Sequence, residues 1–508
     1  MPDRETVSRR EFLIGASALA AVAGDGESLA GGTARSDASL LELSAVEAVA
    51  LMSRGDLSAE HYAGALLARA AAEKALNAFI TLDPERVLEA ARAADLRRSR
   101  GAATGLLHGL PVPVKDSLNT AEYPTTAGTP ALRGFRPAAD APLVAALRGA
   151  GAIVMGKTNL HELSYGWTSN NLAYGAVRNP YDRTRIPGGS SGGTAVAIAA
   201  HMAPLGVAED TEGSIRVPAA LCGVVGFRPT TGRYSTVGAV PISPLFDQAG
   251  PHARSVADIG LFDAAVTGDR RPLVTGALHG VRLAVNRSYF FGGLDPLVER
   301  VTNEALSRLR EAGVELVDVE LPRLAELIDL ITYEVQNHDV RIELARYLTT
   351  YGAPVNFDEL IAQASQDIRA VFASSVLPGG RDFVPEASYH AAVEVHLPAL
   401  RREFAAAFAR SGAAAFVFPA TMVTAPPIGV EDELTIAGRQ VPFDVAIARN
   451  IAPGSTTGLP GLVLPAGLAT DGLPVALEFD GPHGADRALL GLGSALEKVL
   501  GRIPAPPG

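Results

Sequence analysis

The chain contains one cysteine, Cys222, among 508 residues, so it can form no intramolecular disulfide and no cysteine-based zinc site. Positive charge is also scarce, since 44 Lys and Arg face 55 Asp and Glu, a formal net charge of -11. A nucleic-acid groove needs clustered Lys and Arg, so we expect no nucleic-acid partner. The excess acidic residues are instead typical of a solvated surface.

Long apolar runs are missing as well, and the apolar run nearest the amino terminus, 12–23, falls short of the ~20 residues that span a membrane. Arg9 and Arg10 precede this run, and small residues follow it, an order typical of a cleaved export signal of the twin-arginine type. We predict that residues 1–30 are this signal and that the mature protein is periplasmic or secreted, without a stable membrane anchor. The alternative is a basic start of a cytosolic protein.

Strand-like and helix-like segments alternate from residue 36 onward, without an internal repeat or a long linker. This alternation predicts an α/β fold whose core is a mixed, mostly parallel sheet covered by helices on both faces. We expect a single domain over 36–505, with a helical insertion at about 322–413 that shapes a pocket. The predicted strands lie at the run ending at Val114 and at 152–156, 222–230, 281–287 and 414–422.

Helix starts and motif matches refine this picture. Ser44 with Glu47 forms a predicted capping box, and Asp83 before Pro84 predicts another helix start. Residues 151–158, "GAIVMGKT", match a phosphate-loop pattern, but the strand occupies the middle of the motif, so we reject a nucleotide site. "HEL" at 161–163 lacks the second histidine of a zinc-protease helix.

The glycine- and serine-rich stretch that begins at Pro187 raises the question of a nucleophile. "GGSSG" at 188–192 matches the nucleophile elbow of α/β-hydrolases, but the preceding segment is polar and proline-rich. His483 with Asp480 is a weak candidate for the missing partners of an elbow serine. The elbow interpretation stays open at this point.

An ordered series of segments carries a more specific signal than any of these motifs. "GLPVPVKDSLNT", "PGGSSGGTAVAIAA" and "DTEGSIRVPAALCGVVGFRPTTGRYS" resemble the amidase signature family of serine hydrolases, and the similarity continues to "DGLPVALEF". It covers nearly the whole chain after the signal, except for the helical insertion. "ELSYGWTSNN" and "VRNPYD" are similar to the arylacetamide-hydrolysing members, such as indoleacetamide and mandelamide hydrolases.

The resemblance implies a fold, an activity and a set of site residues. It implies the amidase signature fold and hydrolysis of a small amide through Lys115, a cis-peptide serine and a nucleophilic serine. Ser214 follows Ser190 by 24 positions, the family interval, which selects Ser190 over Ser191 as the cis serine. The remaining implied residues are Thr211, Glu212 and Gly213 for the oxyanion hole, and Gly189, Tyr165 and Trp167 for substrate binding.

The chemistry needs these residue types because a serine hydroxyl is a poor nucleophile until a base takes its proton. Lysine is protonated at neutral pH, with a pKa near ~10.4, but burial lowers the pKa of a lysine. Ser190 then relays the proton from Ser214 to Lys115, and an acyl-enzyme forms without a metal or cofactor. Asp210 and Arg216 flank the nucleophile, and we expect them to form a structural ion pair.

Two residues depart from the family pattern. Glu212 stands where glycine is usual, and Glu209 stands where threonine is common. A positive φ at Glu212 would strain the backbone, and its carboxylate would oppose an oxyanion or bind a donor group of the substrate.

Alternative functions stay open on the sequence alone. A carbamate, anilide or ester substrate would use the same chemistry, and a non-catalytic homologue would act as a binding protein. The family also includes one component of the amidotransferase that serves transfer-RNA charging, and the export signal argues against that role. The sequence leaves the oligomeric state open, with a homodimer among the options.

Overall fold

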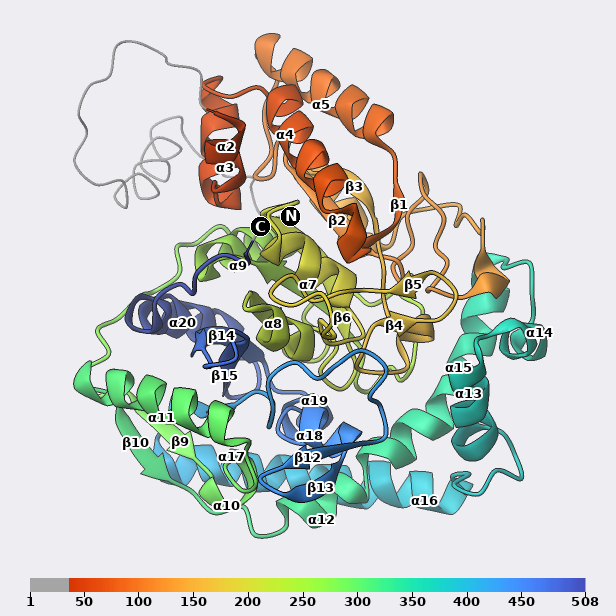
Figure 1. Ribbon diagram of the computed structural model, residues 1–508, viewed down its shortest axis with the longest axis vertical. Helices are drawn as coiled ribbons and strands as arrows, with labels where there is room; N and C mark the ends of the chain where they lie inside the picture. Colours follow the sequence, from red (N-terminus) through yellow and green to blue (C-terminus); the bar gives the residue numbers. More distant parts are fainter. Residues whose placement is uncertain (1–35, 508) are drawn as a thin grey trace, which may run out of the picture.

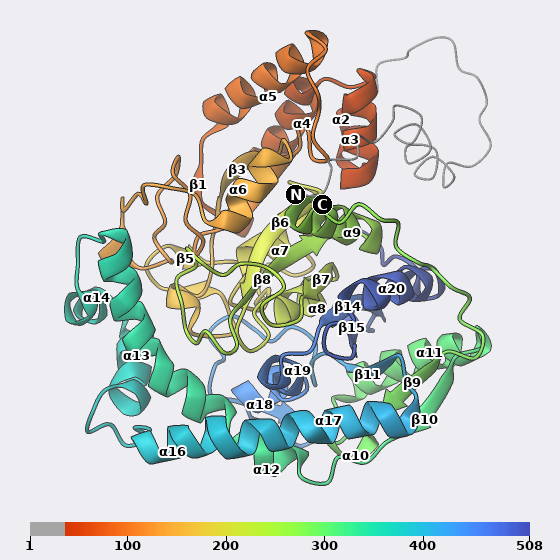
Figure 2. The same ribbon diagram turned by 180° about the vertical axis from the view of Figure 1, so that it is seen from behind.

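The computed structural model describes residues 36–507, and the predicted export signal at 1–30 lies outside this range. Its centre is an 11-stranded sheet in the order β1-β3-β2-β6-β8-β7-β14-β15-β11-β9-β10. The strands are β1 (Phe79–Leu82), β2 (Pro111–Lys115), β3 (Ile153–Thr158), β6 (Leu205–Asp210), β7 (Val225–Arg228), β8 (Gln248–Ala253), β9 (Arg282–Val285), β10 (Glu315–Asp318), β11 (Ala415–Pro419), β14 (Gly461–Leu468) and β15 (Pro474–Asp480). Helices flank this sheet, so the α/β class is confirmed (Figures 1 and 2).

The direction of the strands changes across the sheet. β3, β2 and β6 pair in parallel, as do β11, β9 and β10 on the other side. Between these groups the pairs from β6 through β8, β7, β14 and β15 to β11 are antiparallel. Two small hairpins lie outside the sheet: β4 (Asn170–Asn171) with β5 (Gly175–Ala176), and β12 (Glu433–Ile436) with β13 (Arg439–Pro442).

Most helices follow or precede a strand and pack on the sheet. α7 contacts β6 and β2, α8 contacts β14 and β15, and α20 contacts β14. The helices outside the later helical segment are α2 (Asp37–Leu41), α3 (Ala45–Arg54), α4 (Ala59–Ala72), α5 (Pro84–Ser99), α6 (Pro142–Gly149), α7 (Gly192–Ala199), α8 (Arg216–Cys222), α9 (Val256–Thr267), α10 (Arg287–Phe290), α11 (Pro296–Glu311), α18 (Phe443–Ala448), α19 (Ala452–Thr457) and α20 (Asp486–Leu500). Short 3-10 turns lie at Lys74–Leu76, Pro130–Leu132 and Glu162–Ser164.

Helix starts behave as their sequences predict. Ser44 and Glu47 form both bonds of a capping box at α3, and the Asp83 side chain caps α5, which begins at Pro84. Both caps satisfy backbone N–H groups that have no partner inside the helix. The two predictions are confirmed.

Between β10 and β11 the chain forms helices only. They are α12 (Leu324–Asp329), α13 (Thr332–Tyr351), α14 (Phe357–Gln363), α15 (Gln366–Val371), η5 (Phe372–Val376), α16 (Glu386–Ala391), η6 (Ala392–His396) and α17 (Leu397–Ser411). α17 lies at the opposite end of the molecule from α4 and α5 (Figures 1 and 2). An apolar cluster that includes Leu344 and Phe372 joins this segment to Leu132 and Leu163. The domain limits 36–505 and the status of this segment as an insertion stay predictions.

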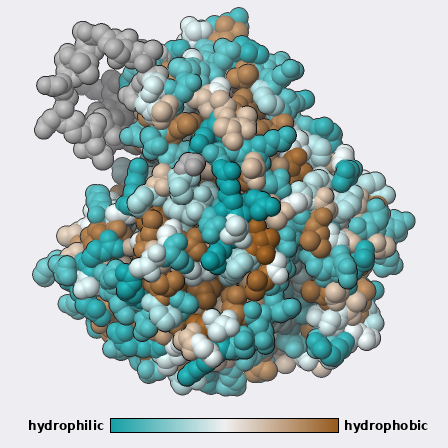
Figure 3. Space-filling view, in the orientation of Figure 1, coloured by the Kyte–Doolittle hydropathy of each residue, from teal (hydrophilic) through white to brown (hydrophobic). Residues whose placement is uncertain are grey.

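Hydrophilic residues dominate the face shown in Figure 3, with smaller apolar areas between them. This agrees with the solvated surface expected from the charge balance. Among the helices of residues 36–507, none combines the length and the apolar character that crossing a bilayer requires.

Candidate active site

Two neighbouring parallel strands bring a lysine and a glutamate together at their carboxyl ends. β2 ends at Lys115 and pairs with β6, which carries Glu209 next to its last residue. Lys115 is fully buried, and its Nζ donates to Oγ of Ser190 at 2.6 Å and to Oε1 of Glu209 at 2.7 Å. Lys115 therefore lies at a strand end, as predicted, and contacts the predicted cis serine, Ser190.

The glycine-rich stretch supplies Ser190 just before α7. The peptide bond between Gly189 and Ser190 is cis, as the resemblance implied. A Cβ on Gly189 would lie 2.7 Å from the carbonyl carbon of Trp167, so only glycine fits at this point. The backbone N–H of His161 and the hydroxyl of Ser169 both donate to the carbonyl of Ser190 at 3.1 Å. These contacts hold Ser190 in place from the backbone side.

Ser214 lies in the turn between β6 and α8, one backbone hydrogen bond from this stretch. The N–H of Ser191 donates to the carbonyl of Ser214 at 3.2 Å, and Ser214 is buried. The hydroxyl of Ser191 donates to the carbonyl of Glu209 at 3.0 Å and does not contact Lys115. Ser191 therefore binds the backbone of β6, whereas Ser190 contacts the lysine.

Burial lowers the pKa of Lys115 below its usual value, because a charged ammonium is costly away from water. The carboxylates of Glu209, Asp210 and Asp247 act in the opposite direction and favour the ammonium. The net direction is downward, which brings the lysine closer to the neutral form that a general base requires.

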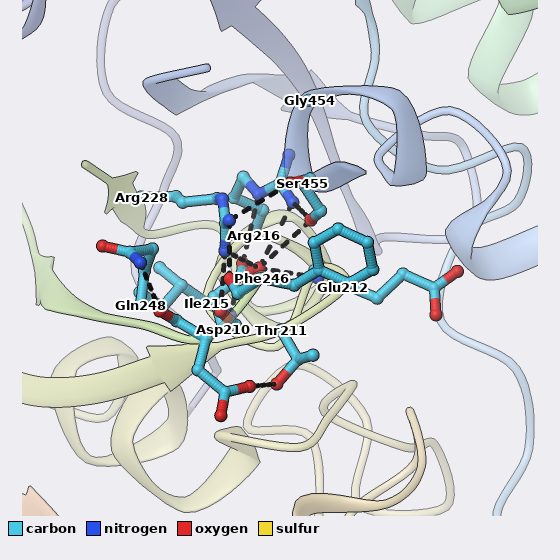
Figure 4. A network of polar contacts seen from close by, with 12 residues as sticks. Asp210, Thr211, Glu212, Ile215, Arg216, Arg228, Phe246, Gln248, Gly454 and Ser455 are labelled. Carbon is cyan, nitrogen blue, oxygen red and sulfur yellow. Dashed lines mark hydrogen bonds and ion pairs between the residues drawn. The ribbon is translucent and has the colours of Figure 1, made fainter. Parts of the chain in front are cut away.

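A buried ion-pair network fixes the turn that carries Ser214 (Figure 4). Asp210 accepts hydrogen bonds from the N–H groups of Gly213 at 2.8 Å and Ile215 at 3.0 Å. The same carboxylate pairs with Arg216 at 3.1 Å and Arg228 at 3.0 Å. Burial opposes ionisation of Asp210, but the two arginines hold its pKa below the usual value. The expected Asp210–Arg216 ion pair is confirmed.

This network corrects one part of the predicted oxyanion hole. The N–H of Gly213 is already donated to Asp210, so it does not point at a developing oxyanion. The roles of the Thr211 and Glu212 N–H groups as oxyanion donors stay predictions. The hydroxyl of Thr211 donates to Asp247 at 2.7 Å, which fixes the first of these residues.

Glu212 does not carry the backbone strain expected for a residue in place of glycine. The left-handed backbone lies one residue later, at Gly213, with φ +125°. The Glu212 side chain points away from the Asp210 network in Figure 4 and accepts a hydrogen bond from Nε2 of Gln336 on α13 at 2.8 Å. Burial raises the pKa of Glu212 to about 8, so at neutral pH the side chain is largely an uncharged acid.

Tyr165 and Trp167, predicted for substrate binding, lie on the loop that follows β3. The Tyr165 hydroxyl donates to Asn337 of α13, and its ring lies 5.0 Å from that of Phe372. Burial, with a further contribution from Glu212, raises the pKa of Tyr165. Trp167 packs against the main hydrophobic core. Their roles toward a substrate stay predictions.

The rejected motifs have structural explanations. Lys157 of the phosphate-loop match lies within β3, fully buried, and pairs with Asp116 at 3.0 Å. His161 is buried and hydrogen-bonds Thr168 at 3.1 Å. Within residues 36–507, no group of three or more His, Cys, Asp or Glu side chains is arranged to hold a metal ion.

Two neighbours of the site were given no role by the sequence. Glu209 stood out as a departure from the family pattern, and its contact with Lys115 depends on the β2–β6 pairing. Gln336 lies 124 positions from Glu212, on a helix without any motif. A second signal for Glu209 was its place in an acidic pair with Asp210 at the end of a short apolar run.

The family model described as Amidase matches residues 63–490. The chain belongs to the amidase signature family. It is an amide-hydrolysing enzyme, and its α/β architecture is that of a solved relative: the peptide amidase from Stenotrophomonas maltophilia superposes with a TM-score of 0.77 at 31% identity, over 92% of this chain and 98% of that one.

Curated relatives of this amidase extend over most of both chains. Mandelamide hydrolase from Pseudomonas putida is 37% identical over 92% of this chain and 93% of the relative. Indoleacetamide hydrolase from Allorhizobium ampelinum is 35% identical over 91% of this chain and 99% of the relative. Both names describe enzymes that hydrolyse a small amide, which agrees with the activity that the family match shows.

Proposed function

We propose that this amidase hydrolyses the C–N bond of a small, arylacetamide-like primary amide, with Ser214 as nucleophile, Ser190 as proton relay and Lys115 as general base. The observation that carries the proposal is the 2.6 Å hydrogen bond between a fully buried lysine and Ser190. The similarity to mandelamide and indoleacetamide hydrolases supports the substrate class.

Proton transfer and bond formation are coupled in this mechanism. Neutral Lys115 accepts the proton of Ser190 while Ser190 accepts that of Ser214, and Oγ of Ser214 attacks the amide carbonyl. The N–H groups of Thr211 and Glu212 stabilise the oxyanion, and each such donor contributes about 3 kcal/mol in the transition state. The proton returns through Ser190 to the leaving nitrogen, the C–N bond breaks and ammonia departs, which leaves the acyl group esterified to Ser214. Water then attacks the ester and passes its proton through Ser190 to Lys115, and the proton returns by the same path to Oγ of Ser214 as the carboxylic acid leaves.

Alanine substitutions test the three roles. With phenylacetamide as probe and ammonia release as readout, Ser214→Ala, Ser190→Ala and Lys115→Ala should each lower kcat/KM at least ~10³-fold, because each removes a step of the proton path. Ser191→Ala is the matched control and should retain turnover, since its hydroxyl contacts a carbonyl and not the lysine. Turnover by Ser214→Ala at a rate near that of the parent enzyme would refute the nucleophile assignment.

The substrate class needs its own comparison. The anilide, the carbamate and the ester that share the phenylacetyl or benzyl group should be assayed beside phenylacetamide, since all pass through the same acyl-enzyme chemistry. We expect the highest kcat/KM for the primary amide. A higher value for the carbamate or the ester would redefine the enzyme within its family.

We also propose that the amidase is exported through the segment 1–30, on the strength of Arg9, Arg10 and the short apolar run. Replacing both arginines by lysine should leave the full-length precursor in the cytoplasm, measured by cell fractionation and intact mass. The unchanged protein should lose its amino-terminal segment and leave the cytoplasm. An uncleaved, cytoplasmic parent protein would contradict the proposal.

A further inference from the structure

Glu209 makes a direct contact with the proposed base. Its Oε1 accepts from Nζ of Lys115 at 2.7 Å, and both side chains are buried. The other contact of Nζ is Oγ of Ser190, at 2.6 Å. The glutamate and the serine together fix the position of the lysine nitrogen. A buried carboxylate at this distance has a second effect, because it favours the protonated form of its partner.

The remaining charged or titratable groups that act on this pair lie on or next to three strands. Asp210 lies beside Glu209 on β6, and Asp247 precedes β8. Burial and the charge of Glu209 raise the pKa of Asp247 to about 7. His161 follows β3 and His252 lies on β8, and burial lowers the pKa of each, so neither adds positive charge at neutral pH. The environment of Lys115 is therefore acidic, with Glu209 as the contacting group.

A second buried lysine–carboxylate pair in the same sheet offers a contrast. Lys157 on β3 pairs with Asp116 at 3.0 Å and also donates to the carbonyl of Leu118 at 2.8 Å. Its remaining contacts are with the carbonyl of Pro124 and the hydroxyl of Thr125, so this lysine contacts no residue of the proposed relay. A structural ion pair satisfies every donor in this way, whereas Lys115 divides its contacts between a carboxylate and the relay serine.

We propose that Glu209 is a positioning residue of the active site, which holds Lys115 on Ser190 and keeps a proton on it, so that the charge of Glu209 sets the lower pH limit of activity. This inference rests on the proposed function, in which Lys115 must be neutral to accept a proton. The sign follows directly. The glutamate favours the ammonium, so its neutralisation frees the base at lower pH, and the acidic limb of the rate profile moves to lower pH.

The test measures how fast a fluorophosphonate probe labels Ser214 as a function of pH, which needs no knowledge of the substrate. In Glu209→Gln the acidic limb should move down by about one pH unit or more, so that labelling below the parent limb is ~10-fold faster. Glu209→Thr, which also removes the charge, should move the limb in the same direction and serves if the first variant does not fold. Glu209→Asp keeps the charge on a shorter arm, so it should leave the limb in place and slow labelling at every pH.

The matched control is Asp258→Asn, which removes a buried carboxylate whose partners are the N–H of Val46 on α3 and the hydroxyl of Ser255 before α9. In Asp258→Asn the acidic limb of the labelling profile should stay at the pH of the parent enzyme. An unmoved limb in both Glu209→Gln and Glu209→Thr contradicts the inference, as does a uniform loss of labelling without a shift. The proposed function fails separately, if Ser214→Ala is still labelled or Lys115→Ala is labelled as fast as the parent.

Discussion

At the scale of single residues, Glu212 places a carboxyl group two positions before the proposed nucleophile. A carboxylate there would repel a developing oxyanion, and the sequence raised the prospect of an impaired enzyme. Burial answers this concern, because it raises the pKa of Glu212 to about 8 and keeps the group largely uncharged at neutral pH. Its backbone is unstrained, since Gly213 takes the positive φ. The departure from the family pattern is therefore compatible with catalysis.

This account predicts a basic limb in the pH profile. A pKa raised to about 8 means that Glu212 ionises as the pH rises through that value, so kcat/KM for phenylacetamide should fall on the alkaline side. Glu212→Gln removes the titrating group and should abolish that fall, while Glu431→Gln, at an exposed glutamate, should retain it. Persistence of the same alkaline limb in Glu212→Gln would show that another group causes it.

At the scale of elements, local signals were sufficient for β2, which carries Lys115, and for two helix starts, but β6, which carries Glu209, was not among the predicted strands. The apolar run before Lys115 predicted a strand end, and β2 ends at that residue. The cap residues Ser44 and Asp83 predicted two helix starts that the structure contains. Strand ends and helix caps depend on residues that are adjacent in the chain, so they can be predicted from the sequence alone.

Contacts between elements that are far apart in the chain could not be predicted from local sequence patterns. The Lys115–Glu209 contact requires β6 to lie beside β2, although β3, β4 and β5 lie between them in the chain. The Gln336–Glu212 contact requires α13 to pack near the turn after β6. No local pattern encodes which strands pair or which helix covers a turn, because many sheet orders bury the same apolar residues.

The contact from α13 makes a prediction about that helix. The amide of Gln336 donates to the Glu212 carboxylate and so lowers the pKa of Glu212 relative to burial alone. In Gln336→Met the pKa should rise, and the alkaline limb of kcat/KM should move to higher pH. Gln363→Met, at an exposed glutamine of α14, is the control and should leave the limb unchanged. A limb that stays in place, or moves to lower pH, in Gln336→Met would show that α13 does not tune the site.

At the scale of the whole molecule, the ordered motif series was more informative than any single motif. It identified the family over nearly the whole chain, and the Amidase match at 63–490 confirms it. Composition excludes an intramolecular disulfide, because Cys222 is the single cysteine of the chain. The order of the sheet and the antiparallel pairs at its centre were beyond reach, since both are properties of non-local pairing.

The identity of the substrate is even harder to predict from the sequence than the order of the strands. Tyr165, which is predicted to bind substrate, comes from the loop after β3, and its hydroxyl donates to Asn337 of α13. Each of these residues is ordinary in its own segment, and only the fold makes them neighbours. The resemblance to arylacetamide hydrolases therefore indicates the class of substrate, and the assays with phenylacetamide and its analogues identify the preferred substrate within it.

The most direct test of the central claim is intact mass spectrometry of the protein after reaction with a fluorophosphonate probe, with the labelled peptide sequenced. We predict a single adduct on Ser214 that is lost in Lys115→Ala, because the serine needs the lysine to become nucleophilic. An adduct on Ser190, or no adduct on the folded protein, would contradict the assignment of Ser214 as the nucleophile and Lys115 as its base.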